Sequence, residues 1–246
     1  MYAKEVELPL QINTVFSEHN WRHFDAIANL VRELGVVFWE VFFLVPMGRG
    51  RELGQLTGAQ FERMFAKLAA VAKGVDFIVK VTEAPHYRRY LMEQRASARR
   101  QAREAPHTSP GEKNLLPAHM RRDFGPGGSI GLAPKGINSG KGHLFVSYCG
   151  DICPSGFLPL ACGNVRSDSI ANVYRSHRVF CELRAPDLLE GKCGVCEFRH
   201  ICGGSRARAY AMTGNYLAEE PFCAYQPSSA SQWSLGLPHS APAAYH

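Results

Sequence analysis

The 246-residue sequence has no long hydrophobic run, no large excess of one charge and no cysteine among its first 148 residues. Its longest apolar stretch, residues 36–45, contains Glu40 and is about half the length of roughly 20 residues that a bilayer-spanning helix needs. The amino terminus, MYAKEVELPLQ, has acidic side chains where a signal peptide has a basic and then an apolar region. We therefore expect a cytoplasmic protein with no membrane span.

The composition is that of a folded globular protein of one or two domains, with 46% hydrophobic and 20% charged residues. The net charge of +6 is modest. It suits an anionic partner but does not by itself indicate nucleic-acid binding. The arginine-rich part of the chain also lacks interleaved aromatic residues, so we expect no nucleic-acid partner.

Residues 1–90 alternate between strand and helix patterns. Apolar runs rich in β-branched and aromatic residues predict three strands, at residues 8–15, 36–45 and 75–82. Between them lie two predicted helices, the first capped by Asn20 and the second opened by a capping box of Thr57 and Gln60. This order implies a parallel α/β sheet with right-handed crossovers. Three strands are too few for a complete sheet or barrel, so we expect the last part of a larger α/β domain.

Polar residues near the strand ends have two interpretations each. Thr82, Glu83 and His86 follow the third strand, where α/β folds place ligands, but a surface turn is the preferred interpretation. Residues 47–51 form a glycine-rich loop that either cradles an anion through backbone N–H groups or only turns the chain.

Residues 91–140 are first rich in arginine and then in proline and glycine. This pattern favours a solvated helix and a flexible linker, with an anion-binding or lid segment as the alternative. Residues 227–246 are rich in Pro, Ser and Ala and predict a disordered tail.

The cysteines are clustered in the second half of a chain that is neither short nor secreted in character, which favours metal binding over disulfides. There are eight: Cys149, Cys153, Cys162, Cys181, Cys193, Cys196, Cys202 and Cys223. The strongest pattern is Cys193-x2-Cys196-x5-Cys202, with Cys223 following 21 positions later. Four such thiolates suit a tetrahedral zinc ion or a [4Fe–4S] cluster, and spacing does not separate the two.

The residues around these cysteines resemble a known family. KCGVCEFRHICGGSRARAYAMTGNYLAEEPFCAYQP (192–227) is similar to the auxiliary-cluster region of radical SAM enzymes with a SPASM or twitch extension. GDICPSGFLPLACGNVRSDSIANVYR (150–175) resembles the hairpin and helix of the same extension, and the three predicted strands resemble late strands of a radical SAM partial barrel. The likeness is to the haem-biosynthesis and peptide-modifying subgroup.

The resemblance implies that four cysteines bind one auxiliary [4Fe–4S] cluster: Cys193, Cys196, Cys202 and Cys223. Two positions that carry cysteine in the two-cluster pattern are here Arg206 and Ser155, which puts a second cluster in doubt. Arg206 and Arg208 either donate hydrogen bonds near cluster sulfurs or are exposed helical arginines. The remaining cysteines are expected to be small buried side chains or free thiols: Cys149, Cys153, Cys162 and Cys181.

The sequence departs from the family at one essential motif. Radical SAM chemistry needs a CxxxCxxC loop, whose cluster binds and cleaves S-adenosylmethionine, and no cysteine precedes Cys149. The resemblance makes Asn13 and Thr14 candidate contacts of S-adenosylmethionine, but ordinary strand-end polar groups are the alternative. This chain would use S-adenosylmethionine only if a partner supplied the missing half of the barrel, and it is expected to be inactive alone.

The expected fold is therefore α/β: late βα units of an incomplete radical SAM partial barrel (1–90), a linker (91–140), a small α+β cysteine-rich SPASM-like iron–sulfur domain (141–226) and a tail (227–246). The expected partners are a peptide or tetrapyrrole precursor and a ferredoxin- or flavodoxin-type reductant. Two other functions remain open: a structural zinc protein, and a non-enzymatic module that binds a peptide at its hairpin edge.

Overall fold

The computed structural model describes residues 5–104 and 137–228. Most of the predicted linker and nearly all of the predicted tail therefore lie outside the described residues. Within them, no helix is long and apolar enough to cross a bilayer.

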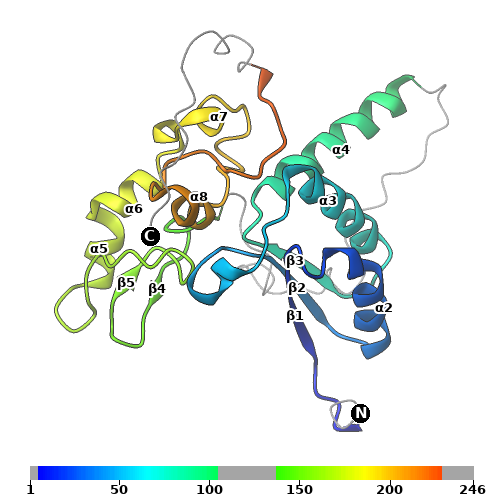
Figure 1. The fold of residues 1–246 in the computed structure, drawn as a ribbon, viewed down its shortest axis with the longest axis horizontal. Helices are drawn as coiled ribbons and strands as arrows, with labels where there is room; N and C mark the ends of the chain where they lie inside the picture. Colours follow the sequence, from blue (N-terminus) through cyan, green and yellow to red (C-terminus); the bar gives the residue numbers. More distant parts are fainter. Residues whose placement is uncertain (1–4, 105–136, 229–246) are drawn as a thin grey trace.

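The amino-terminal unit is the predicted parallel sheet, with strand order β1-β2-β3. Its strands are β1 (Gln11–Phe16), β2 (Phe38–Phe43) and β3 (Ile78–Thr82). The helices between them are α2 (Phe24–Leu34) and α3 (Gly58–Lys73). Figure 1 shows both helices on one side of the sheet. The prediction of a parallel α/β unit is confirmed.

The core lies between the sheet and its two helices. Alternate strand residues face the helices, so Trp39, Val41 and Phe43 of β2 are buried against Phe61 and Phe65 of α3. The predicted capping box of α3 is present: Thr57 accepts a hydrogen bond from the Gln60 backbone N–H, and Gln60 accepts one from the Thr57 backbone N–H.

The start of the first helix differs from the prediction. A 3₁₀ turn, η1 (Trp21–His23), precedes α2, and Asn20 makes no capping hydrogen bond. Its side chain instead accepts from the Ser17 backbone N–H at 3.0 Å and donates to the Val15 carbonyl at 2.9 Å. Asn20 therefore closes the turn that leaves β1, because local bonds of this kind compete with capping.

The carboxy-terminal unit is built from short elements. A two-stranded antiparallel hairpin, β4 (Phe145–Val146) and β5 (Ile152–Cys153), confirms the predicted hairpin. Ser169 caps the helix that follows, since its side chain accepts a hydrogen bond from the Asn172 backbone N–H. The helices and 3₁₀ turns are α5 (Ile170–Ser176), α6 (Arg178–Leu183), η4 (Pro186–Leu188), α7 (Gly191–Gly194) and α8 (Arg206–Thr213).

The second unit docks on the carboxyl ends of β2 and β3, beside α4 (His86–Glu104) (Figure 1). Arg208 of α8 makes this junction. Its guanidinium donates to the backbone carbonyls of Glu83 at 2.6 Å, Leu44 at 3.1 Å and Phe43 at 3.4 Å, and it pairs with Glu220 at 3.1 Å. A fully buried charge is stable only when paired and hydrogen-bonded, and Arg208 meets both conditions.

Candidate metal centre

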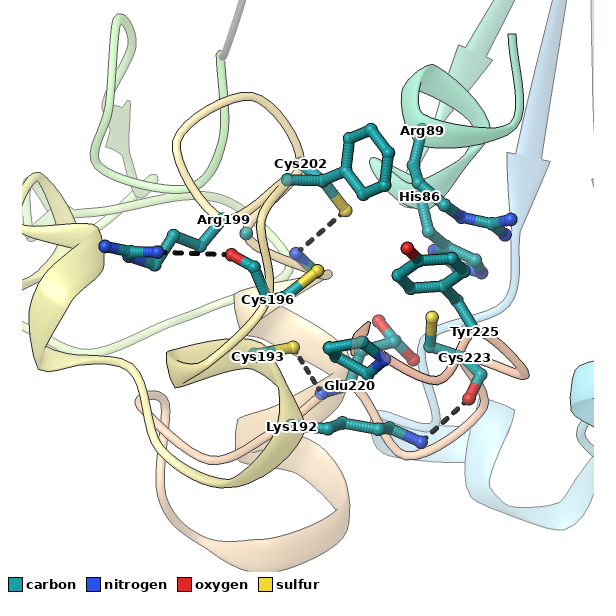
Figure 2. A pocket seen from close by; sticks show the side chains of 14 residues that line it. His86, Arg89, Lys192, Cys193, Cys196, Arg199, Cys202, Glu220, Cys223 and Tyr225 are labelled. Carbon is teal, nitrogen blue, oxygen red and sulfur yellow. Dashed lines mark hydrogen bonds between the residues drawn. The ribbon is translucent and has the colours of Figure 1, made fainter. Parts of the chain in front are cut away.

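Four cysteines line one pocket between the two units. The pocket has a volume of about 380 Å³, part of it open to solvent. Figure 2 shows Cys193, Cys196 and Cys202 on one side and Cys223 on the other, with their sulfur atoms facing the space between them. The structure thus brings the four sequence-predicted ligands to one place, from α7, the loop after it and a segment about 20 residues further along the chain.

Glycines give the cysteine loop its shape. A Cβ on Gly194 would lie 2.1 Å from the Leu189 carbonyl oxygen, so only glycine fits between Cys193 and Cys196. Gly204 has a φ of +65°, in the left-handed region that glycine adopts without strain. This conformation lets the Gly204 N–H turn back to the Cys202 Sγ at 3.4 Å.

Each of the four sulfurs has a backbone N–H partner. The Glu220 N–H donates to the Cys193 Sγ at 3.3 Å, and the Gly204 N–H donates to the Cys202 Sγ. The N–H groups of Phe198 and Tyr225 act in the same sense on Cys196 and Cys223, where their hydrogen bonds lower the thiol pKa. Such bonds favour negatively charged sulfur. The loop backbone is therefore arranged to receive thiolates.

Burial opposes the negative charge on the sulfur atoms that the N–H groups favour. It raises the pKa of Cys193, Cys196 and Cys202, and it raises the pKa of Cys223 to about 11. Without a cation the four groups are therefore protonated at neutral pH. A bound metal would reverse this balance, because coordinating thiols lose their protons.

The sulfurs are not arranged around a single ion. Among the described residues, no group of three or more His, Cys, Asp or Glu side chains could hold one metal ion. The sulfurs of a tetrahedral zinc site lie about 3.8 Å apart, since each Zn–S bond is about 2.3 Å long. A [4Fe–4S] cluster binds each thiolate through a different iron, so its ligand sulfurs stand further apart. Four thiol donors facing one pocket suit such a cluster, and no group of three among the described residues is placed to hold one ion.

The other four cysteines are placed differently. Cys149 and Cys181 are exposed, Cys153 and Cys162 are buried, and none forms a disulfide. The Sγ of Cys162 donates to the Leu160 carbonyl at 3.3 Å, and that of Cys153 lies 3.8 Å from the Asp151 carbonyl. These contacts are those of protonated thiols.

Arg206 and Ser155, which stand where the two-cluster pattern has cysteine, are both buried. Arg206 donates to the carbonyls of Tyr216 at 2.9 Å and Ala218 at 2.7 Å, and its Nη2 lies 4.0 Å from the Cys193 Sγ. The interpretation of Arg206 and Arg208 as exposed helical arginines is therefore wrong. Arg206 holds the segment that returns toward Cys223, and its charge favours the Cys193 thiolate.

The surface-turn interpretation is also wrong for the residues after β3. Glu83 has a φ of +58°, and its carboxylate accepts a hydrogen bond from the Ser205 hydroxyl at 2.6 Å. Burial raises its pKa more than Ser205 and Arg208 lower it. His86 is fully buried, lines the cysteine pocket and has a pKa lowered to about 3, chiefly by burial.

Sequence reasoning missed Glu220 and Lys192. The Glu220 carboxylate accepts from the Ser205 N–H at 2.8 Å and from Arg208, while Lys192 donates to the Cys223 carbonyl at 2.7 Å. Burial raises the pKa of Glu220, but the charge of Arg208 and the hydrogen bond from the Ser205 N–H lower it, and the net result is a pKa below its usual range. One sequence signal could have identified them. Glu220 lies three residues before Cys223, and Lys192 lies one residue before Cys193, so both are next to candidate ligands.

Asn13 and Thr14 point to opposite faces of the sheet. The Thr14 Oγ1 accepts a hydrogen bond from the buried Trp39 indole at 3.0 Å, on the face that the helices cover. Asn13 is exposed and pairs in register with Glu40, which in turn pairs with Lys80. These three residues form a polar row on the other face, with the Lys80 Nζ 2.9 Å from the Glu40 carboxylate. Residues 47–51 lie mostly in the 3₁₀ turn η2 (Gly48–Glu52).

Comparison with known proteins gives relatives of one kind, although no family model matches the chain. The AdoMet-dependent heme synthase of Methanosarcina barkeri is 37% identical over 224 residues, covering 91% of this chain and 58% of that protein. The corresponding enzyme of Oleidesulfovibrio alaskensis is 35% identical over 228 residues, covering 92% of this chain and 53% of its own length.

A shorter match, 34% identical over 104 residues, covers 39% of this chain and 27% of the PqqA peptide cyclase of Bradyrhizobium diazoefficiens. The chain spans a little over half the length of the two heme synthases. These matches confirm the resemblance drawn from residues 192–227: the chain is a homologue of the radical SAM/SPASM proteins.

Proposed function

We propose that this chain forms the auxiliary iron–sulfur part of a radical SAM/SPASM enzyme and holds one [4Fe–4S] cluster. The proposed ligands are Cys193, Cys196, Cys202 and Cys223. The observation that carries the proposal is that these four sulfurs line one pocket and that each is paired with a backbone N–H. When bound, such a cluster accepts and donates single electrons.

The two units have separate tasks in this proposal. Residues 1–90 are late βα units of a partial barrel, and residues 141–226 are a SPASM-like domain that Arg208 fixes to the carboxyl ends of β2 and β3. Because α/β folds bind ligands at these ends, the cysteine pocket lies where it can serve a substrate held by the sheet. Asn13 is the better candidate for an S-adenosylmethionine contact, since the Thr14 hydroxyl is bonded to Trp39 on the helix-covered face.

The proposed substrate is a tetrapyrrole precursor, because the relatives that match most of the chain are heme synthases. A peptide is the second choice, supported by the shorter match to a peptide cyclase. The reaction would take place in the cytoplasm with a ferredoxin- or flavodoxin-type reductant. Cleavage of S-adenosylmethionine needs a CxxxCxxC loop that is not among these 246 residues, so this chain alone does not supply that step.

Anaerobic purification and metal analysis test the proposal. The chain, reconstituted with iron and sulfide, should be brown and contain about four irons and four sulfides per molecule. A colourless protein with one zinc per chain and no sulfide would instead establish the structural zinc function. Incubation of the reconstituted chain with S-adenosylmethionine and a strong reductant should release no 5′-deoxyadenosine.

A further inference from the structure

His86, the first residue of α4, has an unusual environment. Its side chain is fully buried, and neither ring nitrogen has a hydrogen-bond partner among the described residues. Phe61 and Phe65 pack against the ring, each with its centroid 4.9 Å from the imidazole centroid. The part of the ring surface not covered by these aromatics borders the cysteine pocket, on the side of Cys223 (Figure 2).

Two unpaired nitrogens in such a place are costly. Each buried polar group without a partner destabilises a protein by about 1–3 kcal/mol, so folded proteins seldom leave one. The Glu220 carboxylate, whose charge acts on His86, does not remove this cost, since it is bonded to Arg208 and to the Ser205 N–H. The missing partner must therefore be something that occupies the pocket.

The hydrogen-bonding groups of the imidazole ring determine which kind of partner it needs. An imidazole ring carries at least one N–H donor in either protonation state. Its N–H needs an electron-rich acceptor, and the sulfur atoms of an iron–sulfur cluster are such acceptors.

We propose that His86 donates an N–H hydrogen bond to a sulfur of the cluster in this pocket and so raises the reduction potential of that cluster. The inference rests on the proposed function. Reduction adds negative charge to the cluster, and a donor aimed at sulfur stabilises the reduced form more than the oxidised form. His86 lies shortly after β3 and therefore belongs to the α/β unit, whereas the four proposed ligands all belong to the other unit. Through His86 the α/β unit would adjust the reduction potential of the cluster.

The experiment uses the full chain after anaerobic reconstitution and compares three variants with the wild type. EPR-monitored redox titration gives the midpoint potential of each cluster. His86→Phe removes the N–H and should shift the potential to more negative values. His86→Gln keeps an N–H donor and should restore part of that shift. His200→Phe makes the same exchange at an exposed position in the cysteine loop and should leave the potential unchanged.

Isotope labelling supplies a second measurement that does not depend on the stability of His86→Phe. With [15N]histidine in the reduced wild-type protein, pulsed EPR should detect a weak nitrogen coupling, of the size transmitted by a hydrogen bond. His86→Gln should abolish it, and His200→Phe should not. This measurement decides the matter if His86→Phe fails to fold.

The outcomes separate the two proposals. A chain that takes up no cluster overturns both. A cluster whose potential is the same in all variants, with no histidine coupling, overturns only the role of His86. A strong coupling, typical of nitrogen bound directly to iron, also overturns that role, because His86 would then be a ligand in place of one cysteine.

Discussion

Two groups of cysteine in this chain differ in the direction of their hydrogen bonds. The sulfurs of the candidate ligands accept backbone N–H groups, as Cys202 does from Gly204. The sulfurs of the two other buried cysteines, Cys153 and Cys162, instead face backbone carbonyls, as Cys162 faces Leu160. A carbonyl partner suits a protonated thiol, whereas an N–H partner suits a thiolate. The hydrogen bonds therefore distinguish the candidate ligand thiols from these two thiols more clearly than burial does, since both groups contain buried members.

The largest expected effect is the loss of the cluster when one ligand is removed. Cys202→Ser should reduce the iron and sulfide content of the reconstituted chain to a small fraction of the wild-type value, because a closed four-thiolate site then lacks one ligand. Cys162→Ser is the matched control at another buried cysteine and should retain the full content. Equal losses in both variants would mean that the direction of the hydrogen bonds does not identify the ligands.

The next largest effect concerns the junction of the two units. Arg208→Met leaves the buried Glu220 charge unpaired and three carbonyls at the strand ends without a donor. We expect a loss of about 3–5 kcal/mol in the free energy of unfolding, measured by denaturant titration. Arg178→Met removes an exposed arginine from its pair with Glu182 and should leave the transition midpoint in place. A junction variant as stable as the wild type would refute the assigned role of Arg208.

Alkylation rates should separate the cysteines in the metal-free chain. Cys149 and Cys181 are exposed and should react first. Cys223, whose pKa burial raises to about 11, and Cys202, whose pKa burial also raises, should react slowly at pH 7. Since only the thiolate reacts, and a raised pKa keeps its fraction low, their rates should still be rising at pH 9. Mass spectrometry of quenched samples gives the order, and fast labelling of Cys202 at neutral pH would contradict it.

The smallest effect distinguishes the two polar residues at the end of β1. Thr14→Val deprives the buried Trp39 indole N–H of its acceptor and should cost about 1–3 kcal/mol of stability. Asn13→Ala lies on the exposed side and should change stability by no more than about 0.5 kcal/mol. Thermal or denaturant unfolding measures both, and equal costs would contradict the assignment of the two faces.

Much of this arrangement was predictable from sequence because it depends on local patterns. Strand periodicity gave the parallel sheet, and the Thr57–Gln60 spacing gave a helix start that the structure has. The cysteine spacing singled out four residues that meet at one pocket. The prediction was wrong in two places. Asn20 bonds to its chain neighbours Ser17 and Val15 instead of capping the helix, and a surface turn was preferred for a histidine that lies buried beneath the second unit.

The burial of Arg206 and Arg208 was also not predictable from a local sequence pattern. The segment RARAY has no apolar face that signals burial, and a sequence pattern assigns two arginines in such a helix to solvent. They are buried because the carbonyls of Phe43 in β2, of Glu83 just after β3, and of Tyr216 and Ala218 receive their N–H groups. These acceptors come from segments far apart in the chain, so no local pattern reveals them.

X-ray absorption spectroscopy at the metal edge of the purified chain tests the central claim most directly. The account predicts iron with sulfur neighbours and, beyond them, short iron–iron scattering, and it predicts that both disappear in Cys202→Ser. A zinc edge with four sulfur neighbours and no second metal, or an iron signal that survives Cys202→Ser unchanged, would contradict it.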